Sequence, residues 1–268
     1  MDDLNWLYVK ELAILWVKEA AEKLKDSLHK DIKIETKSNP DDLVTEMDRK
    51  IEQFFLSKIK KHFPTHLFLG EEGVYKQDLT REGTLWIIDP IDGTTNFVHQ
   101  QYNFAISLAV YHNGVGMIGI TYNVMSDELF HAVRGQGAYL NSRRLPKLKT
   151  VRLEESILGL NARWLLTKDA KQSERLINLS KSVRSIRSYG SAAIEIAYVV
   201  LGRLDGYISL RLAPWDFAAG LVLLQEVGGK YSTFDGKPLN ILQESSVFVG
   251  EKKLHEEVME NIIKKGAE

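Results

Sequence analysis

Two carboxylates three residues apart follow an apolar segment of strand character and precede a glycine and two threonines. Residues 85–98 read L-W-I-I-D-P-I-D-G-T-T-N-F-V. The two carboxylates are Asp89 and Asp92, and Asp92 is followed directly by Gly93. Carboxylate oxygens bind hard cations such as Mg²⁺, and the free N–H groups at the start of a helix bind phosphate. If a helix begins near Thr94, the sequence predicts a site that holds phosphate between a metal ion and backbone donors.

The geometry predicted for this site is a strand that ends at Asp89 and a tight turn that carries Asp92. Pro90 would stiffen the turn, and Gly93 tolerates a positive φ. A bare D-x-x-D-G pattern also occurs in calcium-binding loops and in ordinary turns, where aspartate forms local hydrogen bonds. The short pattern leaves these interpretations open, so the rest of the chain has to decide between them.

Composition narrows the classes of function. The chain has 268 residues, of which 44% are hydrophobic, enough for one large domain or two packed halves. With 35 basic and 36 acidic residues and no long run of either sign, we expect no nucleic-acid or membrane partner. Cysteine is absent and the seven histidines are scattered, which favours oxygen ligands and Mg²⁺, Mn²⁺ or Ca²⁺. The sequence shows neither a signal-peptide pattern nor a membrane-span pattern, so we expect a cytoplasmic protein.

Helices packed on an antiparallel meander are predicted for the first half, residues 1–145. An amphipathic first helix is indicated by apolar residues at helical spacing, namely Leu4, Leu7, Tyr8, Leu12, Leu15, Trp16, Ala20, Leu24 and Leu28. Asn39 and Pro40 predict an N-cap and a first helical residue, with Asp42 helping to cap. Strands are predicted at 66–69, 84–88, 104–111, 115–122, 128–133 and 138–140.

The second half, residues 146–268, alternates strand and helix patterns, which indicates an α/β arrangement. Strands are predicted at 156–160, 183–186, 207–210 and 246–249, and helices at 171–180, 191–201, 214–227 and 252–265. The basic stretch 143–149 is the predicted boundary between the halves. We expect the two halves to form one compact catalytic unit.

Three more acidic residues lie where they could complete a metal site. Asp48 shares a helix face with apolar residues, so it lies at the edge of that face, bonds a neighbouring backbone group, or points at a site. Asp216 follows Pro214 at the start of a predicted helix, where aspartate is more often a cap than a ligand. Glu71 follows a predicted strand and has glycines nearby, although acidic turns are usually only solvated.

Four motifs in one order resemble the inositol monophosphatase family, which belongs to a superfamily of Mg²⁺-dependent, lithium-sensitive phosphatases that includes fructose-1,6-bisphosphatases. Residues 86–97 are close to the family signature. The other motifs are D-x-V-T-x-x-D at 42–48, G-E-E at 70–72 and W-D-x-A-A-G at 215–220. The resemblance covers nearly the whole chain. It implies a mixed α+β and α/β fold, a five-layer α-β-α-β-α sandwich of the inositol monophosphatase and fructose-1,6-bisphosphatase type, and usually a homodimer.

The resemblance also implies the metal ligands. Glu71, Asp89 and the backbone carbonyl of Ile91 would hold one Mg²⁺, and Asp89, Asp92 and Asp216 would hold a second. Some members of the family bind a third ion near Glu71, and Mn²⁺ is a substitute for Mg²⁺. For Asp216 the matched motif therefore favours the ligand over the cap.

The mechanism implied by the resemblance is in-line attack of water on a phosphate monoester, without a phosphoenzyme. Thr94 and Asp48 resemble the pair that orients the water, and Glu71 is the third predicted catalytic residue. The residues predicted to bind substrate are Asp92, Gly93, Thr94, Thr95, Ser191, Ala192, Ser209 and Arg211. Ser191 and Ala192 belong to a turn that resembles the family's G-[ST]-A-A, although small residues there could equally pack a helix N-terminus.

The leaving-group pocket departs from the family pattern. Many inositol monophosphatases have a glutamate that binds sugar hydroxyls six residues before the tryptophan of W-D, and this position is Ser209 here. Arg211 is either a solvated loop arginine or a ligand for an extra anionic group on the substrate.

The predicted function is Mg²⁺-dependent hydrolysis of inositol monophosphate or a similar polyol or sugar phosphate, with inhibition by Li⁺. The first alternative is the same chemistry on fructose 1,6-bisphosphate, NADP(H) or a 3′-phosphonucleotide. The second is a non-catalytic binding protein on the same fold.

Overall fold

The computed structural model describes residues 5–29, 34–36, 43–73 and 82–264. Its α-helices are α1 (Trp6–Ser27), α2 (Glu46–His62), α3 (Thr94–His99), α4 (Ala170–Ser182), α5 (Ala192–Leu201), α6 (Pro214–Glu226) and α7 (Lys252–Val258), and a π-helical segment (Met259–Lys264) extends α7. Short 3₁₀ helices are Leu153–Glu155 and Ala162–Leu166.

The strands lie between and beside these helices. They are β1 (Ile34–Thr36), β2 (Leu43–Thr45), β3 (Leu67–Gly70), β4 (Thr84–Asp92), β5 (Ala105–His112), β6 (Val115–Asn123), β7 (Glu128–Val133), β8 (Ala138–Leu140), β9 (Arg143–Arg144), β10 (Ile157–Leu160), β11 (Ser185–Arg187), β12 (Gly206–Leu212), β13 (Lys230–Ser232) and β14 (Ser245–Gly250). Strands β5 to β8 follow the predicted strands to within one residue, which confirms the predicted meander.

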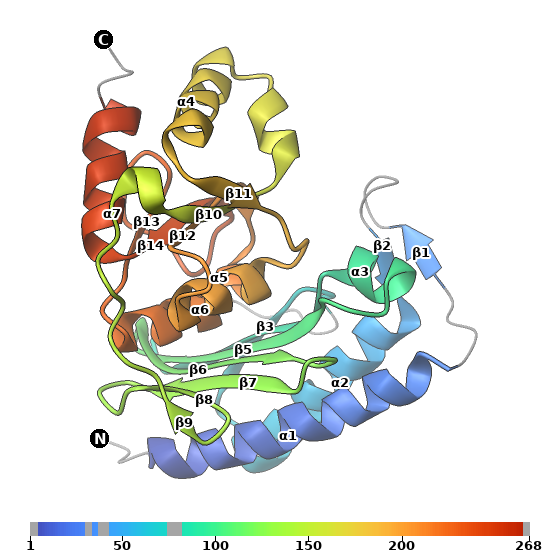
Figure 1. The fold of residues 1–268 in the computed structure, drawn as a ribbon. Helices are drawn as coiled ribbons and strands as arrows, with labels where there is room; N and C mark the ends of the chain where they lie inside the picture. Colours follow the sequence, from blue (N-terminus) through green and yellow to red (C-terminus); the bar gives the residue numbers. More distant parts are fainter. Residues whose placement is uncertain (1–4, 30–33, 37–42, 74–81, 265–268) are drawn as a thin grey trace.

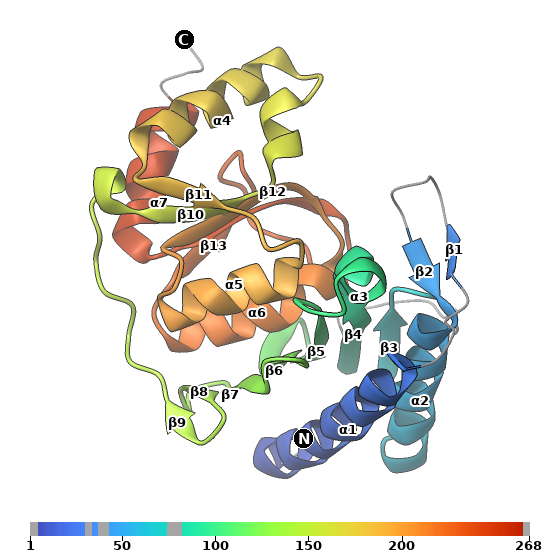
Figure 2. The same cartoon turned by 45° about the vertical axis from the view of Figure 1, so that its right-hand side comes forward.

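The elements stack in five layers, which confirms the predicted α-β-α-β-α sandwich (Figure 1). Helices α1 and α2 cover one face of a seven-stranded sheet of order β3-β4-β5-β6-β7-β8-β9. Helices α5 and α6 form the middle layer, and a five-stranded sheet of order β11-β10-β12-β14-β13 lies beyond them, with α4 and α7 outside it (Figure 2). The division of the chain at residue 145 stays a prediction.

The backbone of the middle layer lies close to the backbone of the larger sheet. A side chain on Gly119 of β6 would place its Cβ 2.4 Å from the carbonyl oxygen of Ala219 on α6. A Cβ on Gly220 would lie 2.4 Å from Ile196 of α5. Only glycine allows these approaches, so α6 is fixed against both the sheet and α5.

Helix α2 begins later than predicted. Residues 43–45 form strand β2, which pairs antiparallel with β1, and Thr45 is the N-cap of α2. The Thr45 side chain accepts the N–H of Met47 at 3.1 Å, and the Thr45 N–H donates to Asp48 at 2.7 Å. This reciprocal capping box is the stronger start signal, so the predicted start near Pro40 is wrong. Asn39, Pro40 and Asp42 lie outside the described residues.

The buried face of α1 also differs from the prediction in part. Leu7, Tyr8 and Leu15 are 51%, 56% and 61% exposed, while Trp16 and Leu24 are buried against α2 and the sheet as expected. The face is completed by smaller residues that the predicted set omitted, namely Val9, Ala13, Val17 and Ala21. In the described part of the chain, no helix combines the length and apolar character needed to cross a membrane.

Candidate active site

Asp89 and Asp92 both lie within strand β4, so the prediction of a strand end followed by a tight turn is wrong. Residues three apart on a regular strand point to opposite faces of the sheet. The pairing of β4 with β5 is irregular between Asp89 and Asp92, where Pro90 cannot donate to the ladder. The irregularity shifts by one residue the alternation of side chains between the two faces of the sheet. Both carboxylates can therefore reach one site.

Asp216 joins them from the first turn of α6. Each of Asp89, Asp92 and Asp216 has a carboxylate oxygen that lies within 4.8 Å of the other two. Asp216 also accepts the N–H of Ala213 at 2.8 Å, so it is both a helix cap and a member of the cluster. Ser107 of β5, which pairs with Asp89, donates to the carbonyl of Trp215 at 2.9 Å and ties the start of α6 to the sheet.

Asp89 and Asp92 are buried, Asp216 is half-buried, and none of the three forms a salt bridge with a basic side chain of the described residues. Burial raises the pKa of Asp89 well above its usual value, and the charges of Glu71, Asp92 and Asp216 raise it further. Burial likewise raises the pKa of Asp92, to about 6, and that of Asp216 well above the usual range. Glu71 lies within hydrogen-bond reach of Asp89. Oxygen ligands and closely spaced negative charges of this kind fit a hard divalent cation.

Helix α3 begins at Thr94, where the sequence suggested a helix start, and Gly93 is its N-cap. Gly93 has φ = 92°, which a side chain disfavours, and a Cβ there would lie 3.1 Å from the carbonyl of Asn103 and 3.2 Å from Ser191. The backbone N–H groups of residues 93–95 lie at the start of this helix, where helix geometry gives them no intrahelical acceptor.

Thr94 lies between Asp48 and the backbone of β4. Its hydroxyl is 3.3 Å from the Oδ1 atom of Asp48 and 3.0 Å from the carbonyl oxygen of Ile91. The Oδ2 atom of Asp48 accepts from both the N–H and the hydroxyl of Thr45. Asp48 is therefore fully buried but paired, and its second oxygen faces Thr94.

The turn that precedes α5 contacts Asp92 of the carboxylate cluster. The hydroxyl of Ser191 donates to Asp92, and the N–H of Ala193 donates to the same oxygen at 2.7 Å. Asn96 of α3 donates to the carbonyl of Tyr189 at 2.7 Å and so holds the turn against α3. The structure thus places Ser191 beside Asp92, and its role in binding substrate stays a prediction.

Comparison with known protein families gives a match, which spans almost the whole length of the chain and agrees with the site and the fold. The model of the inositol monophosphatase family matches residues 5–266. The chain belongs to this family. It is therefore a phosphatase that hydrolyses phosphate monoesters.

Curated relatives and solved structures of the inositol monophosphatase family match this chain closely. The Bacillus subtilis inositol-1-monophosphatase is 49% identical over 259 residues, which cover 97% of this chain and 98% of the relative. A fructose-1,6-bisphosphatase/inositol-1-monophosphatase of Thermotoga maritima is 38% identical over 226 residues, 84% of either chain. The crystal structure of inositol monophosphatase-II from Staphylococcus aureus is 41% identical, covers 96% of this chain and 94% of its own, and superimposes with a TM-score of 0.89.

Ser209, which departs from the family pattern, and the nearby Arg211 lie at the end of β12. Ser209 is buried, and its hydroxyl donates to the carbonyl of Arg211 at 3.1 Å within an irregular part of the strand. The guanidinium of Arg211 is exposed and pairs with Glu244 at 3.0 Å. Ser209 therefore uses its hydroxyl within the strand, while Arg211 has only an exposed partner.

Sequence reasoning missed a second group of polar residues, which hold the backbone of the site. Glu52 of α2 is fully buried and accepts the N–H of Glu72 at 2.6 Å, beside the predicted ligand Glu71. A Cβ on Gly70 would lie 2.3 Å from the Glu52 carboxyl, which explains the glycine of G-E-E. The signal was present, because Glu52 is one turn after Asp48 on the same apolar helix face.

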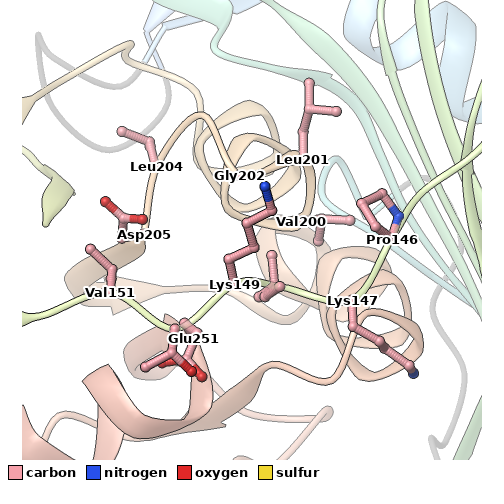
Figure 3. Close-up of a pocket in the computed structure, with 12 residues that line it drawn as sticks. Pro146, Lys147, Lys149, Val151, Val200, Leu201, Gly202, Leu204, Asp205 and Glu251 are labelled. Carbon is pink, nitrogen blue, oxygen red and sulfur yellow. The ribbon is translucent and has the colours of Figure 1, made fainter.

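A cavity of about 440 Å³ lies elsewhere, between residues 146–151 and the end of α5 (Figure 3). Asp205 and Glu251 contribute carboxylates to its wall, and Lys149 contributes an ammonium group. None of the predicted site residues lines this cavity. The family chemistry therefore belongs to the carboxylate cluster.

Proposed function

We propose that the chain is a Mg²⁺-dependent phosphomonoesterase whose substrate is inositol monophosphate or a similar polyol or sugar phosphate. The observation that carries the proposal is the cluster of Asp89, Asp92 and Asp216 within 4.8 Å, directly before the backbone donors of α3. SaIMPase-II, 39% identical to this chain, has been crystallised with inositol monophosphate bound. A homodimer and a cytoplasmic location stay predictions from the sequence.

The donor set fits Mg²⁺ because every ligand is an oxygen atom. Glu71, Asp89 and the carbonyl of Ile91 would hold one ion, and Asp89, Asp92 and Asp216 a second. A third ion near Glu71 and substitution by Mn²⁺ are parts of the same proposal. A related IMPase/NADP phosphatase, 29% identical, has been crystallised with Mg²⁺ and phosphate.

When bound, Mg²⁺ lowers the pKa of water and neutralises the charge of the phosphoryl group. The chain supplies the orientation of the reactants. A hydroxyl has a single hydrogen to donate, so with the Ile91 carbonyl engaged by a cation the Thr94 hydroxyl would donate to Asp48, and its lone pairs could then accept a hydrogen bond from a water. The N–H groups of Gly93, Thr94 and Thr95 would bind the phosphate oxygens, and Ser191 and Ala192 would line the opposite wall.

Phosphate release from a panel of monoesters tests the proposal. With Mg²⁺ present, we expect turnover of inositol 1-phosphate, and inhibition by millimolar Li⁺. The Asp89→Asn variant serves as the blank. If no member of the panel releases phosphate, the proposed activity is wrong and a binding protein on this fold is favoured.

A second substrate class is supported by the exposed guanidinium of Arg211. A relative carries the name fructose-1,6-bisphosphatase/inositol-1-monophosphatase, and an IMPase/NADP phosphatase, 30% identical, has been crystallised with NADP and Ca²⁺. The pair between Arg211 and Glu244 is exposed, so it is worth at most about 1 kcal/mol and an anionic group can displace it.

The Arg211→Ala variant should separate substrates by charge. We expect KM to rise about fivefold or more for fructose 1,6-bisphosphate and NADP, a loss of about 1 kcal/mol of binding, with little change for inositol 1-phosphate. Glu244→Gln should act in the opposite direction because it releases the guanidinium. An equal effect of Arg211→Ala on all three substrates would exclude a role of Arg211 in specificity.

A further inference from the structure

A buried glutamate with no role in the proposed chemistry lies behind the turn that carries Ser191. Glu195 of α5 is 2% exposed. Its Oε1 atom accepts the N–H of Tyr189 at 2.8 Å and the N–H of Gly190 at 3.3 Å. One carboxylate oxygen therefore fixes two consecutive backbone groups just before Ser191.

The second oxygen of Glu195 makes this arrangement costly. Oε2 is buried and has no hydrogen-bond partner among the described residues. It lies where a Cβ on Gly159 would come within 2.5 Å, so the neighbouring strand β10 leaves space for it. Burial raises the pKa of Glu195 to about 7, and the charge of Asp92 adds to the effect. A buried carboxyl that is only half satisfied lowers stability.

In return for this loss of stability, hydrogen bonds fix the turn of residues 189–193 from two sides. Glu195 binds the N–H groups of the turn, while Asn96 binds the carbonyl of Tyr189. Gly190 has φ = 77° and a Cβ there would lie 2.9 Å from the Asn96 amide, so the turn has one narrow conformation. In this conformation the hydroxyl of Ser191 and the N–H of Ala193 both reach Asp92.

We infer that Glu195 is a positioning residue that acts through the 189–193 turn to orient the Asp92 carboxylate for metal binding. Ser191 and Ala193 both donate to the Oδ2 atom of Asp92, and Asp92 contributes a carboxylate oxygen to the cluster with Asp89 and Asp216. Groups that orient metal ligands in this way typically change metal affinity by about 10- to 100-fold when they are removed. This inference rests on the proposed function.

The test compares Glu195→Ala with a matched glutamate far from the carboxylates. Glu226 accepts the N–H groups of Gly135 and Gly137 at 2.7 and 2.6 Å, and so holds the turn between β7 and β8 in the same manner. Both variants are expected to lower the melting temperature. Only Glu195→Ala should raise the half-saturating Mg²⁺ concentration, by about tenfold, and shrink the rise in melting temperature that Mg²⁺ produces.

Two further variants decide whether Glu195 acts through Ser191. Glu195→Gln keeps an acceptor for both N–H groups and should restore most of the Mg²⁺ response. Glu195→Ala combined with Ser191→Ala should be no worse than the more severe single variant, because both changes release the same carboxylate. If Glu195→Ala does not fold, Glu195→Asp replaces it, since the shorter side chain withdraws the acceptor from the turn.

The inference is overturned if Glu195→Ala matches Glu226→Ala in its Mg²⁺ response, or if the effects of Glu195→Ala and Ser191→Ala add in full. The melting-temperature measurement with Mg²⁺ requires no substrate. A wild-type protein that binds Mg²⁺ but releases no phosphate would contradict the proposed function alone, and the comparison of variants would still decide the role of Glu195.

Discussion

Asp89→Asn is expected to abolish Mg²⁺-dependent phosphate release while making the metal-free protein more stable. Asp89 is buried beside Glu71, Asp92 and Asp216, and its charge is repelled by theirs. It would also contribute to both proposed metal sites, so we expect turnover to fall at least about a thousandfold, equivalent to ~4 kcal/mol. The measurements are phosphate release and the melting temperature with and without Mg²⁺.

The stability of the metal-free protein should depend on pH in a defined direction. The pKa of Asp92 is raised to about 6, and those of Asp89 and Asp216 are raised well above their usual range. Groups with a raised folded-state pKa stabilise fully below their unfolded pKa, and this stabilisation is lost as the pH rises through the folded pKa. Without metal, stability should therefore fall as the pH rises from about 4 through 6, and Mg²⁺ should suppress the fall.

The control for Asp89→Asn is Asp169→Asn. Asp169 caps α4 by accepting the N–H groups of Lys171 and Gln172, far from the cluster in the sequence, and asparagine caps a helix equally well. Asp169→Asn should leave turnover, the Mg²⁺ response and the pH profile unchanged. A metal-free Asp89→Asn protein that melts below the wild type would contradict the repulsion argument.

Thr94→Ala should lower kcat by about 100-fold or more without changing Mg²⁺ binding. The variant removes the hydroxyl that lies 3.3 Å from Asp48 and is proposed to orient the attacking water. Losses of about 10²- to 10⁴-fold are typical when a group that positions or transfers a proton is removed. The backbone N–H of residue 94 is retained, so KM and the Mg²⁺-induced rise in melting temperature should stay close to wild type.

Two further variants show whether the effect on kcat arises from the orientation of water or from the stability of α2. Thr94→Ser retains the hydroxyl and should retain most of kcat. Thr45→Ala removes the cap from α2 and one bond to Asp48, so it should cost about 1 kcal/mol of stability but leave the Thr94–Asp48 contact and kcat in place. A loss of kcat in Thr45→Ala as large as in Thr94→Ala would show that Asp48 acts through stability.

Local patterns predicted the meander of β5 to β8 and the start of α3, because alternation and turn residues act over a few positions. The motifs then predicted which carboxylates share a site, and Asp89, Asp92 and Asp216 do lie together. The irregularity in β4 between Asp89 and Asp92 was not predicted, because Pro90 was expected to stiffen a turn after the strand, whereas it lies inside the strand and interrupts its pairing with β5.

The start of α2 was mispredicted because two capping signals compete. Pro40 is a good first helical residue, but Thr45 and Asp48 form a reciprocal cap and residues 43–45 pair with β1. The buried glutamates Glu52 and Glu195 escaped prediction for another reason. The position of Glu52 on an apolar helix face indicated a buried carboxylate, but the backbone N–H groups that both glutamates bind lie outside their own helices and could not be read from the side-chain pattern.

Burial separates the parts of this protein that evolution can change freely from those it cannot. Helix α6 carries Asp216 in the middle layer and touches the sheet through Gly119 and α5 through Gly220, so almost any substitution there disturbs both neighbours. Arg211 and Glu244 are 71% and 51% exposed and support no other element with their charged groups. With the role proposed for Arg211, a single substitution at this rim would change substrate preference without disturbing the packing that holds Asp216.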